Sequence, residues 1–153
     1  MLQSKTLLIE QLDKKIKAFQ LSAKVIPPAL GWIKSIRTTL GISLKQLSKK
    51  MNITKQSLQE IEMRENKGSV TLKTLKEVAQ ALDMQLVYGF VPKDGSLETL
   101  IERKAKELAL KIVSRTEHSM KLENQTIDAN RIKKALQERI ELIKKEMPKT
   151  LWD

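Results

Sequence analysis

Apolar residues recur at helical spacing along most of the chain, beginning at its N-terminal end. Residues 1–24 carry apolar side chains three or four positions apart with lysines between them: Leu8, Leu12, Ile16 and Phe19. This spacing places the side chains on one face and predicts an amphipathic helix. Adjacent prolines cannot continue a helix, so residues 25–30 are expected to be a linker. Whether the first helix joins a core, dimerises or contacts a partner stays open.

The middle of the chain, residues 31–95, has four short helical patterns separated by turn-forming residues. The patterns are "GWIKSIRTTLG", "SLKQLSKKM", "TKQSLQEIEMRE" and "TLKTLKEVAQALD". Ser43 and Thr54 precede the second and third patterns as N-caps. The pattern changes at residues 85–91, where "QLVYGFV" predicts a short β-strand. One strand cannot stand alone, so pairing with its copy across a dimer is attractive.

Two longer helical patterns follow in residues 96–153. The first begins at Ser96 and has these apolar positions: Leu97, Leu100, Ile101, Ala105, Leu108 and Ile112. The second begins near Asp128, ends at Pro148 and has these: Ile132, Leu136, Ile140, Ile143 and Met147. Two such helices form either a hairpin or an interdigitated pair with a second subunit.

The stretch "SLKQLSKKMNITKQSLQEIE" has the spacing of a helix-turn-helix. A small residue, Ser48, stands where the two helices would cross, and a turn-former, Asn52, follows four residues later. A bulky residue at 48 would push the helices apart, and a β-branched residue at 52 would resist positive φ. The segment resembles the lambda-repressor and Cro-like class over roughly residues 31–83, the alternative being a generic helical hairpin. The predicted fold is mostly α: a lambda-repressor-like helix-turn-helix domain with one short appended β-strand and a C-terminal helical hairpin.

In that class the start of the second motif helix enters the major groove of DNA. The outward-facing residues there are Lys55, Gln56, Gln59 and Glu60. Lysine and glutamine suit guanine and adenine edges, whereas the glutamate accepts from cytosine or orients a neighbour. Ser43, Thr54 and their helix N-termini are candidates for binding phosphate through backbone N–H groups. One unit reads only a few base pairs, which implies a dimer on a palindromic double-stranded operator.

Arg37 and Glu62 occupy positions that in relatives often form an ion pair between the first and third helices. The alternative is two solvated charges.

The charge of the chain fits a polyanionic partner. Lys and Arg number 29 against 18 acidic residues, a net charge of +11. The excess is +5 in residues 31–95 and +3 in each flanking segment, 1–30 and 96–153. Such a surplus favours nucleic acid, and less often a membrane surface. Aromatic residues make up only 3%, which disfavours base-stacking platforms for single strands.

Several classes of chemistry are excluded by composition. The chain has no Cys and one His, His118, so neither a disulfide nor a thiolate or histidine metal site is expected. No Gly-rich phosphate loop, long apolar run or signal-peptide pattern is present. We therefore expect a cytoplasmic protein without metal, cofactor, membrane span or catalytic activity.

Beyond the DNA-binding pattern, four stretches resemble the family called mobile mystery protein A. They are "PPALGWIKSIR", "GSVTLKTLKEVAQALDMQLVYGFVP", "EHSMKLENQ" and the terminal "LWD". Family members usually have Gly at the positions of Asn52 and Asp83, and often "EG" where this chain has "EN" at 123–124. Genes of this family typically lie beside one for a Fic-domain protein, mobile mystery protein B. Fic enzymes transfer AMP from ATP to hydroxyl side chains, and several are toxins.

The resemblance implies a role for residues 119–124. Fic inhibitors share Ser or Thr, three residues, Glu, then Gly or Asn, and this chain matches at Ser119, Glu123 and Asn124. Four-residue spacing puts the serine and the glutamate on one helix face. In the known mechanism the glutamate pairs with the Fic-motif arginine that would otherwise hold the ATP γ-phosphate. The other interpretation is the solvated end of a helix.

The resulting hypothesis is an antitoxin that binds its operator as a homodimeric autorepressor and inhibits a Fic-domain toxin. The alternative is a dimeric helix-turn-helix regulator whose C-terminal helices only dimerise or sense a ligand. A basic RNA- or membrane-binding protein is a third, less favoured possibility.

Overall fold

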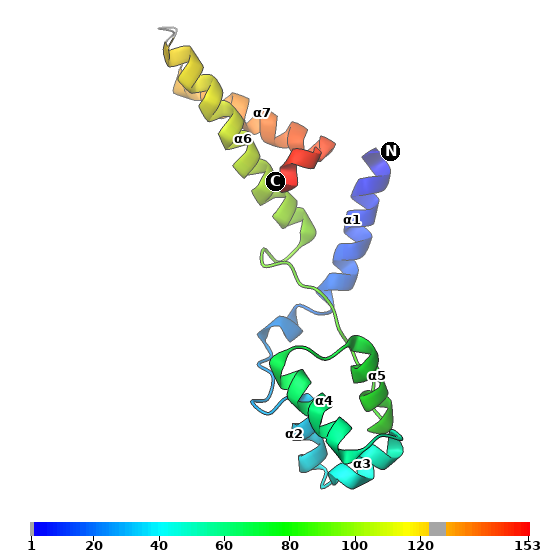
Figure 1. Cartoon of the computed structure of the whole chain (residues 1–153). Helices are drawn as coiled ribbons and strands as arrows, with labels where there is room; N and C mark the ends of the chain where they lie inside the picture. The colour runs from blue at the N-terminus through cyan, green and yellow to red at the C-terminus, as the bar shows by residue number, and fades with distance from the viewer. Residues whose placement is uncertain (1, 123–127) are drawn as a thin grey trace. The chain divides into compact units, whose positions relative to one another are not determined.

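The chain is built from helices joined by turns. The computed structural model describes residues 2–122 and 128–153 (Figure 1). Its elements are α1 (Leu2–Lys17), η1 (Leu21–Lys24), α2 (Trp32–Thr39), α3 (Leu44–Lys50), α4 (Lys55–Lys67), α5 (Leu72–Ala81), α6 (Leu97–Leu122), α7 (Ala129–Glu146) and η2 (Lys149–Trp152). They fall into two compact units. Unit 2 is Lys24–Tyr88, and unit 1 combines Met1–Ala23 with Gly89–Asp153.

The β-strand predicted at residues 85–91 is wrong. This segment has no regular secondary structure, and no strand occurs in the ranges that the structure describes. A β-prone sequence forms a strand only where a neighbouring segment completes the hydrogen-bonded ladder. Within the described chain no segment does so, because every other long element is a helix.

The core of unit 2 takes one buried side chain from each of four helices. Ile33 of α2, Leu47 of α3, Leu58 of α4 and Val78 of α5 are each at most 4% exposed. Ser48 is also buried, where α3 packs on α4, and its hydroxyl donates to the Lys45 carbonyl (3.2 Å). A small, internally bonded side chain lets the two helices approach closely without an unpaired polar group.

The turn between α3 and α4 depends on one left-handed residue. Asn52 has φ of 54°, a conformation that Asn tolerates better than most other residues with a side chain. Two positions later Thr54 caps α4 by accepting the Ser57 N–H at 3.0 Å. The chain thus reverses direction within the few residues between the helices and places the start of α4 at the surface.

The core of unit 1 lies between α6 and α7, which run antiparallel side by side (Figure 1). Its buried side chains are Ile101, Ala105, Ala109, Ile140, Ile143 and Leu151. Two alanines on α6 allow the helices to pack closely, and Leu151 of η2 folds back onto them. Trp152 is 52% exposed, and its neighbour Leu151 takes the buried place.

The first helix joins unit 1, because α1 packs against α6. Ile9 lies against the unit 1 core, and the Asp13 carboxylate accepts the backbone N–H groups of Leu97 (2.7 Å) and Glu98 (3.3 Å). Ser96 accepts the next one, that of Thr99, at 3.1 Å. The first turn of α6 is therefore capped twice, once from within and once from a residue more than eighty positions away.

Candidate nucleic-acid interface

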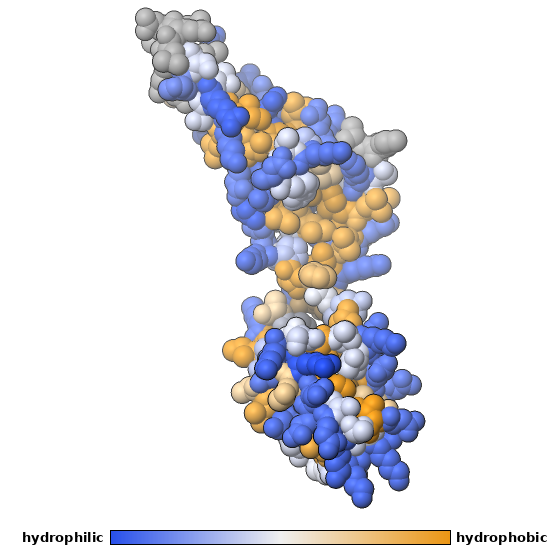
Figure 2. All heavy atoms as spheres, in the orientation of Figure 1, coloured by the Kyte–Doolittle hydropathy of each residue, from blue (hydrophilic) through white to orange (hydrophobic). Residues whose placement is uncertain are grey.

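The beginning of α4 is presented beside a shallow basic hollow. The hollow, of about 700 Å³, lies between α3 and the turn, and Lys45, Lys49 and Lys55 line it together with Thr54 and Asn52. No acidic residue lines it, and none of the three lysines forms an ion pair within the described chain. Figure 2 shows hydrophilic side chains crowded over the end of unit 2 that carries α3. Such a surface suits a phosphate backbone.

Both motif helices begin at a residue whose side chain caps the helix. At α3, Ser43 accepts the Gln46 N–H at 3.1 Å while the Gln46 amide oxygen accepts the Ser43 N–H at 2.8 Å, a complete capping box. At α4, the Thr54 hydroxyl accepts the Ser57 backbone N–H at 3.0 Å and donates to the Ser57 hydroxyl at 2.9 Å. The remaining N–H groups of the first turn of α4 carry the positive end of the helix dipole, which is favourable for an anion.

The candidate base-reading residues of α4 are all exposed: Lys55, Gln56, Gln59 and Glu60. Lys55 forms no ion pair with described residues, whereas the Glu60 carboxylate pairs with Arg64 Nη2 at 3.3 Å, one turn along the helix. Both of these side chains are about 60% exposed, so the pair is weak. Arg64 was not among the residues predicted from the sequence, although its spacing from Glu60 is the signal that would have found it.

A buried ion pair fixes the position of α4 in unit 2. Arg37 Nε and Glu62 Oε1 are 2.6 Å apart, Arg37 Nη2 donates to Glu62 Oε2 at 3.2 Å, and Nη1 donates to the Ile42 carbonyl at 3.1 Å. The two residues are 7% and 5% exposed. A buried charge is tolerated only when it is paired. The ion pair therefore connects α2 to α4, and the bond from Arg37 to Ile42 connects both to the loop that precedes α3.

A second carboxylate on the same face of α4 caps α2. Glu65 accepts the backbone N–H groups of Trp32 (2.7 Å) and Ile33 (2.9 Å). Gly31, which precedes α2, has φ of 82°, and a side chain there would meet the Glu65 carboxylate at about 3.0 Å. Sequence reasoning missed this contact, because nothing local marks Glu65 as the partner of residues more than thirty positions earlier.

Residues 33–88 match the family of helix-turn-helix domains. The chain carries a helix-turn-helix domain of the Cro and lambda-repressor type. The match spans α2 to α5, the elements that form the unit 2 core and place the start of α4 at the surface. No curated protein and no solved structure matches the chain. The helix-turn-helix domain supports a DNA-binding transcriptional regulator.

Two features are absent from residues 2–122 and 128–153, a membrane span and a metal-binding cluster. None of the helices there is both long enough and apolar enough to cross a membrane. No group of three His, Asp or Glu side chains in residues 2–122 and 128–153 is placed to hold a metal ion.

Of the three residues in the candidate inhibitory motif, the structure places one. Ser119 lies near the end of α6, is exposed, and its hydroxyl donates to the Arg115 carbonyl at 3.1 Å. Glu123 and Asn124 lie outside the described residues. The motif thus begins in the final turn of a helix whose other end is held in the unit 1 core.

Proposed function

We propose that the chain is a dimeric repressor of its own operator and the antitoxin of a Fic-domain partner. The observation that carries the DNA-binding half is the helix-turn-helix domain with an unpaired basic hollow at the start of its second motif helix. The antitoxin half is supported by the family resemblance and by the exposed position of Ser119 at the end of α6.

On DNA, the division of labour follows from the chemistry of each side chain. Lys45 and Lys49 face phosphates, and their ammonium groups are free of ion pairs in the described chain. Lys55, Gln56 and Gln59 face base edges, where glutamine can pair with adenine and lysine with guanine. The buried pair under α4 keeps these side chains in register, and a two-fold dimer places two such helices one DNA turn apart.

On the partner, Glu123 competes for an arginine. Its carboxylate forms a bidentate, charge-assisted pair with the guanidinium that would otherwise hold the ATP γ-phosphate. ATP then binds without productive alignment, and AMP transfer stops. In the sequence Ser119 stands four residues before the glutamate, and Asn124 directly after it. The unit 1 core holds the base of α6, so Ser119, the first residue of the motif, is carried by a supported helix.

The DNA-binding half is tested by measuring operator affinity against salt concentration. Replacing Lys55 and Gln56 by alanine should cost about 1–3 kcal/mol for each base contact and remove the preference for operator over unrelated DNA. The matched control is Lys67→Ala at the opposite end of α4, an exposed lysine with no ion pair among the described residues. If both variants lose the same affinity, or if preference survives in the double variant, α4 is not the reading helix.

The antitoxin half is tested with a Fic-domain protein, the partner that the family resemblance implies. Glu123→Gln removes the carboxylate while keeping its shape, so AMP transfer by the co-purified partner should recover. Glu138→Gln, an exposed glutamate of α7 with no ion pair among described residues, is the control. If the partner still transfers no AMP with Glu123→Gln, competition for the Fic-motif arginine is refuted. The alternative, a dimeric regulator without an inhibitory role, then remains.

A further inference from the structure

The positive charge of the C-terminal segment is concentrated at one end of the α6–α7 pair. Residues 110–139, which contain the end of α6 and the start of α7, have seven Lys or Arg and four Asp or Glu. The flanking segments 96–109 and 140–153 are each balanced, with three basic and three acidic residues. The whole excess of the segment therefore surrounds Ser119.

The two ends also differ in how their charges are paired. Near the unit 1 core four of the six cations have acidic partners, in the pairs Arg103–Asp94, Arg103–Glu107, Lys104–Glu107, Lys106–Glu102 and Lys144–Glu141, and only Lys145 and Lys149 form no ion pair with described residues. At the other end six exposed cations form no ion pair with any described residue: Lys111, Arg115, Arg131, Lys133, Lys134 and Arg139. Their charge is not neutralised by any described residue, which leaves it available to another molecule.

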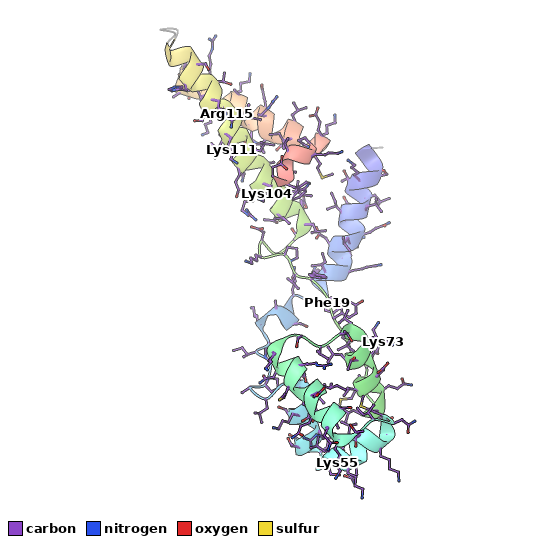
Figure 3. The ribbon with its side chains drawn as sticks, viewed as in Figure 1. Phe19, Lys55, Lys73, Lys104, Lys111 and Arg115 are labelled. Carbon is purple, nitrogen blue, oxygen red and sulfur yellow. The ribbon has the colours of Figure 1, made fainter. Side chains whose placement is uncertain are left out.

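Two of these cations stand in one row with the candidate motif. Lys111, Arg115 and Ser119 are each four residues apart, so they follow one stripe of α6. Figure 3 shows Lys104, Lys111 and Arg115 along the helix. Four residues of helix rise only about 6 Å. A protein that contacts Ser119 therefore also covers Arg115 and meets its charge.

We propose that this basic end of the hairpin docks on an acidic face of the protein partner. The inference rests on the proposed function, and adds to it the surface by which the partner is chosen. Oppositely charged faces accelerate encounter and disfavour wrong partners, and their effect weakens as salt screens it. Protein is favoured over DNA as the occupant because the row continues into the inhibitory motif, whereas the DNA-facing lysines belong to unit 2.

The test reverses the charge of the row in the full-length chain. Lys111→Glu with Arg115→Glu should weaken binding of the acidic partner by about tenfold or more at low salt, mainly through slower association, and less at high salt. Lys145→Glu with Lys149→Glu makes the same change in net charge at the balanced end, where both lysines are exposed, and should bind almost as the parent does. Circular dichroism of both variants checks that the helices persist.

The possible outcomes distinguish failure of the docking surface from failure of the proposed function. If the parent binds and inhibits but the row variant matches the control, the docking surface is refuted and the inhibitory motif survives. If operator affinity falls with the row variant while partner binding holds, the surface contacts DNA and the inference is wrong. If the parent itself neither binds nor inhibits the Fic-domain protein, the proposed function and the docking surface fall together.

Discussion

Removing the buried carboxylate of Glu62 should strongly destabilise the helix-turn-helix domain. Glu62→Ala deletes two charge-assisted hydrogen bonds, at 2.6 and 3.2 Å, and leaves Arg37 with only the Ile42 carbonyl. Each such bond contributes about 1.5–3 kcal/mol. Breaking a buried pair by removing one partner costs about 3–5 kcal/mol. Because Arg37 is 7% exposed and regains some water, we expect about 3 kcal/mol.

The assay is urea unfolding followed by fluorescence of Trp32, which begins α2 in the same unit. Replacing the half-exposed Trp152 by Phe in all variants removes the signal from unit 1. Two controls sharpen the result. Glu60→Ala, which breaks an exposed pair, should cost only about 0–1 kcal/mol. The double change Arg37→Met with Glu62→Leu should cost less than Glu62→Ala, because no charge is left unpaired. Equal losses for Glu60→Ala and Glu62→Ala would refute the reasoning.

Two other changes test contacts in unit 1. Gly89→Ala places a methyl group 2.9 Å from Phe19 Cγ, so overpacking should lower the stability of unit 1 by about 1–3 kcal/mol, measured by thermal unfolding with Trp152 fluorescence, and Phe19→Leu in the same chain should relieve part of it. Arg103 holds the pKa of Asp94 below its ordinary value of 3.8 by a hydrogen bond, so Arg103→Gln should raise that pKa in an NMR titration of the carboxyl carbon. A carboxyl group whose pKa is lower in the folded chain than in the unfolded chain stabilises the fold at pH values above its unfolded pKa. The parent should therefore be more stable than Arg103→Gln at neutral pH, and this difference in the free energy of unfolding should fade as the pH drops through the lowered pKa of Asp94.

The helix-turn-helix was predictable because its determinants are local. Ser48 and Asn52 are four residues apart, and the caps at Ser43 and Thr54 are bonded to residues three positions ahead. A short window of sequence contains the whole signal, since helix starts and turns depend on nearest neighbours. The candidate DNA-facing residues followed from the same window and from the class that it resembles.

What the sequence did not predict depends on distant residues. Glu65 caps a helix that begins more than thirty positions earlier, and Asp13 caps one that begins more than eighty positions later. No periodicity marks such partners. The prediction of a strand at 85–91 is wrong for a related reason. A β-prone composition makes an extended conformation favourable, but it does not determine whether another segment lies beside it to pair with.

The packing of α1 against α6 determines the order in which the protein can be completed during synthesis. Unit 2 is a continuous segment inserted between the two parts of unit 1. Its helices can therefore pack as soon as Tyr88 has left the ribosome, while α1 still lacks the helix start that Asp13 caps. At roughly 5–20 residues per second, α1 waits several seconds for α6 with its apolar face uncovered. The DNA-binding domain is thus the first part of each newly made chain that can assemble.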